Sequence, residues 1–237
     1  MTDVHLHVLH VPGADPERDE IVARLRGTEG VSACVHPDPH RRGVMQNWLS
    51  AIVCAVKNDP ADQPWAYVLS DDADPAMPPD SDPRWVDEMT AAAQYSPAPI
   101  LGMTHFGKIG RDIYAKEAAY GVGRDVTWGG AIAYRRDILP DMVRWCLRVA
   151  QETGYPHDDR LVGAYAYRSG FKAAMCGRAI FGQPVKRSLL GHNTPIREPS
   201  STIAEPPISD WSEGTVMNVS RSLDKKAREL AERYSDA

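Results

Sequence analysis

The spacing of apolar residues along the chain predicts a succession of strands and helices. Short apolar runs and alternating apolar positions predict strands at 4–11, 31–36, 65–70, 100–104, 131–134 and 171–176. Apolar residues three and four positions apart predict helices at 17–26, 44–57, 80–95, 140–153, 158–169 and 222–234. Strands and helices alternate in the first part of the chain, which is typical of an α/β fold with a parallel sheet wound by right-handed crossovers.

Two segments depart from this alternation. Residues 105–125 contain glycines and basic residues without clear periodicity, and we expect a loop-rich insertion there. Residues 194–215 are rich in proline, serine and threonine, which predicts an extended segment. The charged helix that follows has little apolar face, so we expect it to pack on a partner. The predicted organisation is therefore a catalytic domain at 1–193 and an extended segment with a terminal helix at 194–237.

Composition narrows the class of protein. A chain of 237 residues with 43% hydrophobic and 25% charged residues is typical of a soluble globular domain. No apolar run approaches the roughly 20 residues that cross a bilayer, so we expect no membrane contact. The N-terminus lacks a basic region followed by an apolar stretch, so we expect a cytoplasmic protein.

The four cysteines are widely spaced and form no CxxC pair. Cys34, Cys54, Cys146 and Cys176 each lie among apolar residues. We therefore expect small buried hydrophobic side chains, without a disulfide or a zinc knuckle.

Charge is distributed unevenly along the chain. The first hundred residues are acidic, whereas the next hundred are basic. An anionic ligand at the junction of the two parts fits this distribution, and so does ordinary solvated surface charge. The overall net charge of −5 argues against a protein that coats nucleic acid without specificity.

An acidic motif, Asp71-Asp72-Ala73-Asp74, directly follows the predicted strand at 65–70. Ligands of open α/β sheets bind at the carboxyl ends of the strands, where this motif lies. Asp72 and Asp74 offer oxygen ligands to Mn²⁺ or Mg²⁺, and such a cation binds phosphate oxygens in turn. The alternative is a polar turn that caps the next segment.

Four motifs carry a resemblance to a known family. They are Asp71-Asp72-Ala73-Asp74, Trp128-Gly129-Gly130-Ala131-Ile132-Ala133-Tyr134, His157-Asp158-Asp159-Arg160-Leu161 and Leu190-Gly191-His192. In this order, over residues 3–193, the chain resembles the GT-A nucleotide-sugar glycosyltransferases. It also looks like small phage-type transferases that modify DNA bases. The resemblance implies an α/β, GT-A-like (Rossmann-like) fold with a mixed, mainly parallel sheet flanked by helices.

The resemblance also implies roles for individual residues. The metal ligands would be Asp72, Asp74 and His192. The residues that contact the nucleotide-sugar donor would be His10, Pro12, Asp38, Arg42, Asn47, Asp71, Asp72 and Lys186. For these donor residues the alternatives are an ordinary Asp-Pro turn and solvated loop charges.

The acceptor side of the implied site has fewer candidates. Trp128, Gly129 and Gly130 would form a platform for the sugar and acceptor, because glycine lets a ligand approach the backbone and indole stacks on rings. Asp158 or Asp159 would act as general base towards an acceptor hydroxyl. The alternatives are a glycine bulge with a core tryptophan, and a helix cap.

These roles imply a metal-dependent hexosyltransferase that uses a nucleotide-sugar, with UDP-sugar as the expected donor. One hypothesis for the acceptor is DNA with hydroxymethylated bases, guided by the basic residues Lys108, Arg111, Lys116 and Arg124. A protein or a small molecule is the alternative acceptor.

Other function classes remain open from the sequence. His5-Leu6-His7 has the HxH spacing with which metal-dependent hydrolases begin, but we expect these histidines on a solvent-facing side of the strand. A nucleotidyltransferase would need a glycine-rich basic loop after the first strand, and Pro12-Gly13-Ala14-Asp15 is a poor match. The third alternative is a non-catalytic module that binds a metal or a nucleotide.

Overall fold

The computed structural model describes residues 3–40, 43–75, 84–104, 107–124, 130–182, 211–219 and 223–235. Its main element is an eight-stranded sheet with the strand order β10-β6-β8-β5-β7-β3-β1-β2. The strands are β1 (Val4–His10), β2 (Val31–Pro37), β3 (Trp65–Ser70), β5 (Ile100–Gly102), β6 (Tyr120–Gly123), β7 (Ala131–Arg135), β8 (Ala173–Cys176) and β10 (Val216–Asn218). The helices are α1 (Pro16–Gly27), α2 (Val44–Asn58), α3 (Arg84–Gln94), α4 (Gly107–Ala115), α5 (Leu139–Thr153), α6 (Asp158–Arg168) and α7 (Lys225–Arg233).

The directions of the strands decide which strand ends lie at the same edge of the sheet. β1 pairs in parallel with both β2 and β3, whereas β7 is antiparallel to β3 and to β5. The carboxyl ends of β1, β2 and β3 therefore lie at one edge of the sheet, together with the start of β7. We call this the carboxyl edge. The predicted α/β class with a mixed, mainly parallel sheet and flanking helices is confirmed.

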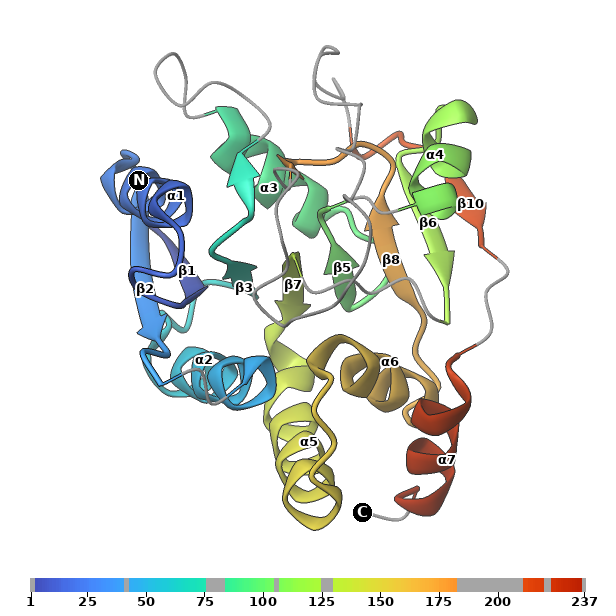
Figure 1. Cartoon of the computed structure of the whole chain (residues 1–237). Helices are drawn as coiled ribbons and strands as arrows, with labels where there is room; N and C mark the ends of the chain where they lie inside the picture. Colours follow the sequence, from blue (N-terminus) through green and yellow to red (C-terminus); the bar gives the residue numbers. More distant parts are fainter. Residues whose placement is uncertain are drawn as a thin grey trace.

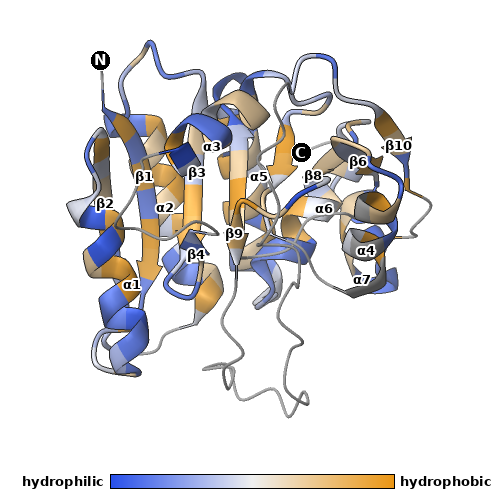
Figure 2. Cartoon of the chain, turned by 90° about the horizontal axis from the view of Figure 1, so that it is seen from above, coloured by the Kyte–Doolittle hydropathy of each residue, from blue (hydrophilic) through white to orange (hydrophobic). Residues whose placement is uncertain are grey.

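Helices cover both faces of the sheet, so the protein has three layers (Figure 1). One apolar core lies between the sheet and α2, α5, α6 and α7, and a second lies between the sheet and α1 and α3. Hydrophilic and hydrophobic residues alternate along β1, which is visible in Figure 2. This alternation directs Leu6 and Val8 into the second core and places Leu9 in the first.

Local signals in the sequence explain where several helices begin and end. Asp15 caps α1 by accepting a hydrogen bond from the backbone nitrogen of Glu17, at 3.0 Å, and Pro16 occupies the first turn. Gly154 ends α5 in the left-handed conformation, with φ of 65°, which favours glycine. Asp224 caps α7 by accepting from the backbone nitrogens of Lys226 and Ala227.

The loop-rich insertion predicted at 105–125 is wrong for most of its length. Residues 107–115 form α4 and residues 120–123 form β6. Two glycines in β6 weaken its strand signal, and the structure explains one of them. A Cβ on Gly121 would lie 2.2 Å from the Ile113 side chain, so any larger residue there would have to displace Ile113 of α4.

The terminal helix also differs from expectation. α7 packs against α6 of its own chain and buries Ala227, Leu230 and Ala231 in the first core. Alanine contributes little to a hydrophobic pattern, which explains why the apolar face was overlooked. β10, which was not predicted, pairs with β6 at the edge of the sheet. Of the segment predicted to be extended, residues 194–210 lie outside the described residues, and Trp211 is buried.

A two-stranded sheet forms beside the carboxyl edge. β4 (Asp74–Pro75) pairs antiparallel with β9 (Phe181–Gly182), and Asp74 lies opposite Gly182. The acidic motif is thereby joined to the chain that follows β8. Among the helices that the structure describes, none is both long enough and apolar enough to cross a membrane.

Candidate functional site at the carboxyl edge

Asp71 joins three elements at the carboxyl edge. Its Oδ2 accepts hydrogen bonds from His10 Nδ1, at 3.1 Å, and from the backbone nitrogen of Val11, at 3.0 Å. Its Oδ1 pairs with Arg18 of α1, and both side chains are almost fully buried. A buried carboxylate is stable only when charge and hydrogen bonds compensate its desolvation, and here they do so from β1 and α1.

Asp72 and Asp74 pair with arginines on the same helix. Asp72 Oδ2 lies 3.0 Å from Arg18 Nη2, and its Oδ1 accepts from the Ser70 hydroxyl. Asp74 Oδ1 lies 2.7 Å from Arg24 Nη2. Burial raises the pKa of Asp74, and Arg24 opposes this shift. The Asp72 side chain is 13% exposed and that of Asp74 is 34% exposed, so Asp74 is the more accessible of the two.

Sequence reasoning missed these arginines, although the helix carried a signal for one of them. Arg18 takes the first position of the apolar stripe that continues with Ile21, Val22 and Leu25, all of them buried. A charged residue on the buried face of a helix indicates a buried partner.

The ends of β1 and β2 form the next part of the site. His10 Nε2 lies 3.0 Å from Asp19 Oδ1, so its ring connects Asp19 with Asp71. Asp38 is 3% exposed, and its backbone nitrogen donates to the His10 carbonyl at 2.7 Å. Asp38 Oδ2 accepts from the backbone nitrogen of Gly43, at 3.2 Å, which fixes the entry to α2. Asn47 is buried in the first turn of that helix.

The structure describes only some of the other residues that were predicted to bind the nucleotide-sugar or the acceptor substrate. Pro12 is exposed in the turn after β1. Gly130 lies against the end of β3, because its carbonyl accepts from the backbone nitrogen of Ser70 at 2.8 Å. The following predicted residues lie outside the described residues: Arg42, Trp128, Gly129, Lys186 and His192.

Asp158 and Asp159 occupy the first turn of α6. Asp158 is buried, and this burial, together with the charge of Asp159, raises the pKa of Asp158 to about 7. The Tyr134 hydroxyl accepts a hydrogen bond from Trp48 Nε1 at 3.1 Å, and burial, with a smaller effect of the nearby Asp158 charge, raises the pKa of Tyr134. Trp48 directly follows Asn47 on α2, so the first turns of α6 and α2 approach the same Trp–Tyr pair.

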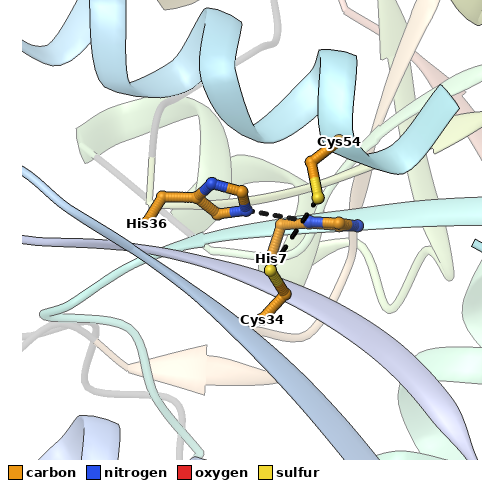
Figure 3. A group of neighbouring side chains, drawn as sticks. All are labelled: His7, Cys34, His36 and Cys54. Atoms are coloured by element: carbon orange, nitrogen blue, oxygen red, sulfur yellow. Dashed lines mark hydrogen bonds between the residues drawn. The ribbon is translucent and has the colours of Figure 1, made fainter. Parts of the chain in front are cut away.

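A second cluster lies on the α2 face of β1 and β2 (Figure 3). It consists of His7 on β1, Cys34 and His36 on β2, and Cys54 on α2, with one ligand atom of each within 4.8 Å of the others. Cys34 Sγ and Cys54 Sγ are 3.8 Å apart, and His7 Nδ1 lies 3.0 Å from His36 Nε2.

This cluster corrects two expectations. His7 is 1% exposed, so it does not lie on a solvent-facing side. Cys34 is exposed and Cys54 partly buried, so neither fills the core, whereas Cys146 and Cys176 are buried as predicted. The signal available in the sequence was the spacing of two residues in His5-Leu6-His7 and Cys34-Val35-His36. The sequence does not show that these two pairs lie side by side with Cys54, because that depends on the pairing register of β1 with β2 and on the position of α2.

In the described part of the chain, no other group of three or more histidine, cysteine or acidic side chains converges in this way. At the acidic motif, the donor atoms are carboxylate oxygens, which suit Mn²⁺ or Mg²⁺. Asp74 contacts Arg24 through Oδ1. Comparison of the sequence with protein-family models and with curated proteins gave no match.

Proposed function

We propose that the protein is a metal-dependent, GT-A-like glycosyltransferase that moves a sugar from a nucleotide-sugar, with UDP-sugar as the first donor to test, to an acceptor hydroxyl. The observation that carries the proposal is the position of the acidic motif, which directly follows β3 at the carboxyl edge and is joined to the end of β1 by the contacts of Asp71 with His10 and Val11. Sites for nucleotides in open α/β sheets are built at this edge.

The pairing of β4 with β9 supports the metal site. It places Gly182 opposite Asp74, so the chain that leads to Lys186 and His192 departs from beside the acidic motif. In the proposed site Asp72, Asp74 and His192 would hold Mn²⁺ or Mg²⁺. When bound, such a cation stabilises the negative charge of a departing diphosphate.

The residues at the strand ends would bind the nucleotide. Asp38 and Asn47 are buried next to the entry of α2, and buried polar side chains can discriminate strongly for a base or ribose that satisfies their hydrogen bonds. His10 is held between Asp19 and Asp71, which fixes the orientation of its ring. Arg18 would keep Asp71 and Asp72 oriented while a donor binds.

Asp158 is the residue that we assign as general base. A carboxylate with a pKa of about 7 is partly deprotonated at neutral pH and still basic enough to accept the proton of an acceptor hydroxyl. Asp159 is less buried and would hydrogen-bond a sugar hydroxyl.

The acceptor that we propose is DNA with hydroxymethylated bases. Lys116 is exposed before β6, and Arg124, at the other end of that strand, lies over the Tyr167 ring, 5.4 Å from its centroid; these are the basic residues that would contact the polyanion. Binding that weakens steeply with added salt would support a polyanionic acceptor. Transfer to a protein or a small molecule, without binding to DNA, would contradict it.

The experiment is a donor screen that measures release of nucleoside diphosphate with and without Mn²⁺. We expect activity with one nucleotide-sugar, its loss on chelation, and a loss of about a thousandfold in Asp72→Ala/Asp74→Ala, because a metal contributes several kcal/mol. The matched control is Asp62→Ala/Asp87→Ala, which removes the same charge from two exposed positions.

Three outcomes separate the function classes. Activity that survives Asp72→Ala/Asp74→Ala in a folded protein would refute the proposed metal site. Metal-dependent hydrolysis that instead requires His5 and His7 would identify a hydrolase. Binding of a nucleotide without turnover of any donor would indicate a non-catalytic module.

A further inference from the structure

We propose that His7, Cys34, His36 and Cys54 form a four-coordinate zinc site, separate from the acidic motif (Figure 3). The site lies between the edge of the sheet and α2. Its role is to fix α2 to β1 and β2, because a site with four protein ligands has no open position for a substrate.

The distances fit tetrahedral coordination. With Zn–S bonds of about 2.3 Å, two sulfurs in a tetrahedron lie about 3.8 Å apart. The Cys34 and Cys54 sulfurs are 3.8 Å apart. With Zn–N bonds of about 2.0–2.1 Å, two nitrogens lie about 3.3 Å apart. His7 Nδ1 and His36 Nε2 are 3.0 Å apart, so a shift of a few tenths of an ångström brings this pair to the tetrahedral separation.

The backbone explains why these four side chains meet. His7 and Cys34 are register partners in the parallel pair β1–β2, and His36 follows Cys34 by two residues on the same face. The ladder of backbone hydrogen bonds therefore fixes three ligands, and α2 supplies the fourth across the first core. β2 is the edge strand and Cys34 is exposed, so a metal ion can reach the site from solvent.

The chemistry of the ligands selects zinc. Two thiolates and two imidazoles form a soft donor set that suits Zn²⁺ and not Mg²⁺ or Mn²⁺. Binding releases the two thiol protons to solvent, and the two thiolates then balance the charge of the cation. A half-buried site with no net charge avoids the cost of an uncompensated ion.

Asp59 is an independent observation in favour of a cation. Its Oδ1 lies 2.9 Å from His7 Nε2, and its side chain is 1% exposed. The carboxylate accepts the Nε2 proton of neutral His7, so the Nδ1 lone pair faces His36 and the two sulfurs. Carboxylate–histidine–metal arrangements of this kind are common around zinc.

The other carboxylate oxygen of Asp59, Oδ2, is buried and has no hydrogen-bond partner in the part of the chain that the structure describes. Among the described residues, the Asp59 carboxylate has ion-pair contacts with His5 and His7, whereas Arg136 donates to the Asp59 backbone carbonyl, at 2.9 Å. A zinc ion bound to His7 Nδ1 would polarise the imidazole and so strengthen the hydrogen bond from Nε2 to the buried carboxylate.

The first test uses the unmodified protein, purified under reducing conditions and analysed for metal by mass spectrometry. We expect one zinc per chain, and a lower melting temperature after removal by a chelator. Cobalt added to the apoprotein should give the visible bands of tetrahedral Co²⁺ and the ultraviolet charge-transfer bands of thiolate ligands. Octahedral cobalt spectra, or spectra without thiolate bands, would overturn the proposal.

The second test compares two double variants. Cys34→Ser/Cys54→Ser should lose zinc and the cobalt spectrum, whereas Cys146→Ala/Cys176→Ala, which removes two buried thiols elsewhere, should retain both. Asp59→Asn keeps all four ligands and should bind zinc about 10- to 100-fold more weakly, as expected for an outer partner of a metal-bound histidine.

Two results would refute the zinc site. Zinc that is retained in Cys34→Ser/Cys54→Ser but lost in Asp72→Ala/Asp74→Ala would place the metal at the acidic motif. A protein without zinc whose mass is lower by two hydrogens under non-reducing conditions would contain a Cys34–Cys54 disulfide. Either result would refute the zinc site. Neither would bear on the proposed transferase activity, which the donor screen tests separately.

Discussion

Arg18 forms ion pairs with two consecutive carboxylates, Asp71 and Asp72, from one guanidinium group. The arginine comes from α1 and the acidic residues from the end of β3, so these contacts join the first helix to the strand that carries the acidic motif. Asp71 also binds His10 and the backbone of Val11. The stability of the carboxyl edge therefore depends on one buried cation.

Replacing Arg18 with methionine should destabilise the protein by about 3–5 kcal/mol, because it leaves the buried Asp71 without its cation. The free energy of unfolding, measured by urea denaturation, is the test. Arg18→Lys should recover only part of the loss, since a single ammonium cannot reproduce the two directed contacts of the guanidinium. A loss below 1 kcal/mol in Arg18→Met would contradict the structure of this network.

Arg24 provides the control for this substitution. Its pair with Asp74 is a third exposed on both sides, so Arg24→Met should cost about 1 kcal/mol or less. The two arginines lie on the same helix, but Arg18 is buried with two carboxylates whereas Arg24 is a third exposed with one.

Most elements of the fold could be predicted from periodicity, and the failures have physical causes. β3 is marked by a continuous apolar run after Pro64, and α2 by apolar residues at helical spacing that end at Asn58-Asp59. β6 was missed because Gly121 and Gly123 remove half of its side chains, and a larger residue at Gly121 would have to displace Ile113. α7 was recognised as a helix, but its buried face consists largely of alanine, so its attachment to α6 was not recognised.

Leu230→Ala tests whether α7 is part of this core. Leu230 is 4% exposed and packs in the first core, so we expect a loss of about 2–5 kcal/mol in the free energy of unfolding. Lys225→Ala, at an exposed position of the same helix, should change it by less than about 0.5 kcal/mol. Equal and small effects of the two substitutions would show that α7 is detached in solution.

The site was only partly predictable, because its partners come from distant elements. Sequence reasoning placed Asp71, Asp72 and Asp74 directly after a strand, since a strand followed by carboxylates is a local pattern. It did not find Arg18 or the meeting of Cys34 with Cys54, because these depend on how α1 and α2 cross the sheet. Alternation shows that His7 and Cys34 each point to one face of a strand, but only the pairing register shows that they are neighbours.

The raised pKa of Asp158 predicts how stability depends on pH. Folded Asp158 keeps its proton up to about pH 7, whereas the unfolded chain loses it near the ordinary value of 3.8. Between these values the folded state binds more protons, so the free energy of unfolding decreases as pH rises. Asp158→Asn should reduce this decrease, and thermal melts from pH 4 to pH 8 would show it. An unchanged pH dependence in Asp158→Asn would mean that Asp158 titrates normally.

The same residue connects stability to the proposed reaction, and the rate provides the sharper test. If Asp158 accepts the proton of the acceptor, kcat/KM should rise with pH through about 7 in the wild-type enzyme. Asp158→Asn should lower kcat by about 10²- to 10⁴-fold and abolish that rise. Asp159→Asn removes a charge that raises the pKa of Asp158, so its profile should keep the rise but shift it to lower pH. A buried acid with a purely structural role would affect stability without moving the pH profile of the rate. An Asp158→Asn enzyme with a wild-type profile would therefore exclude Asp158 as the base.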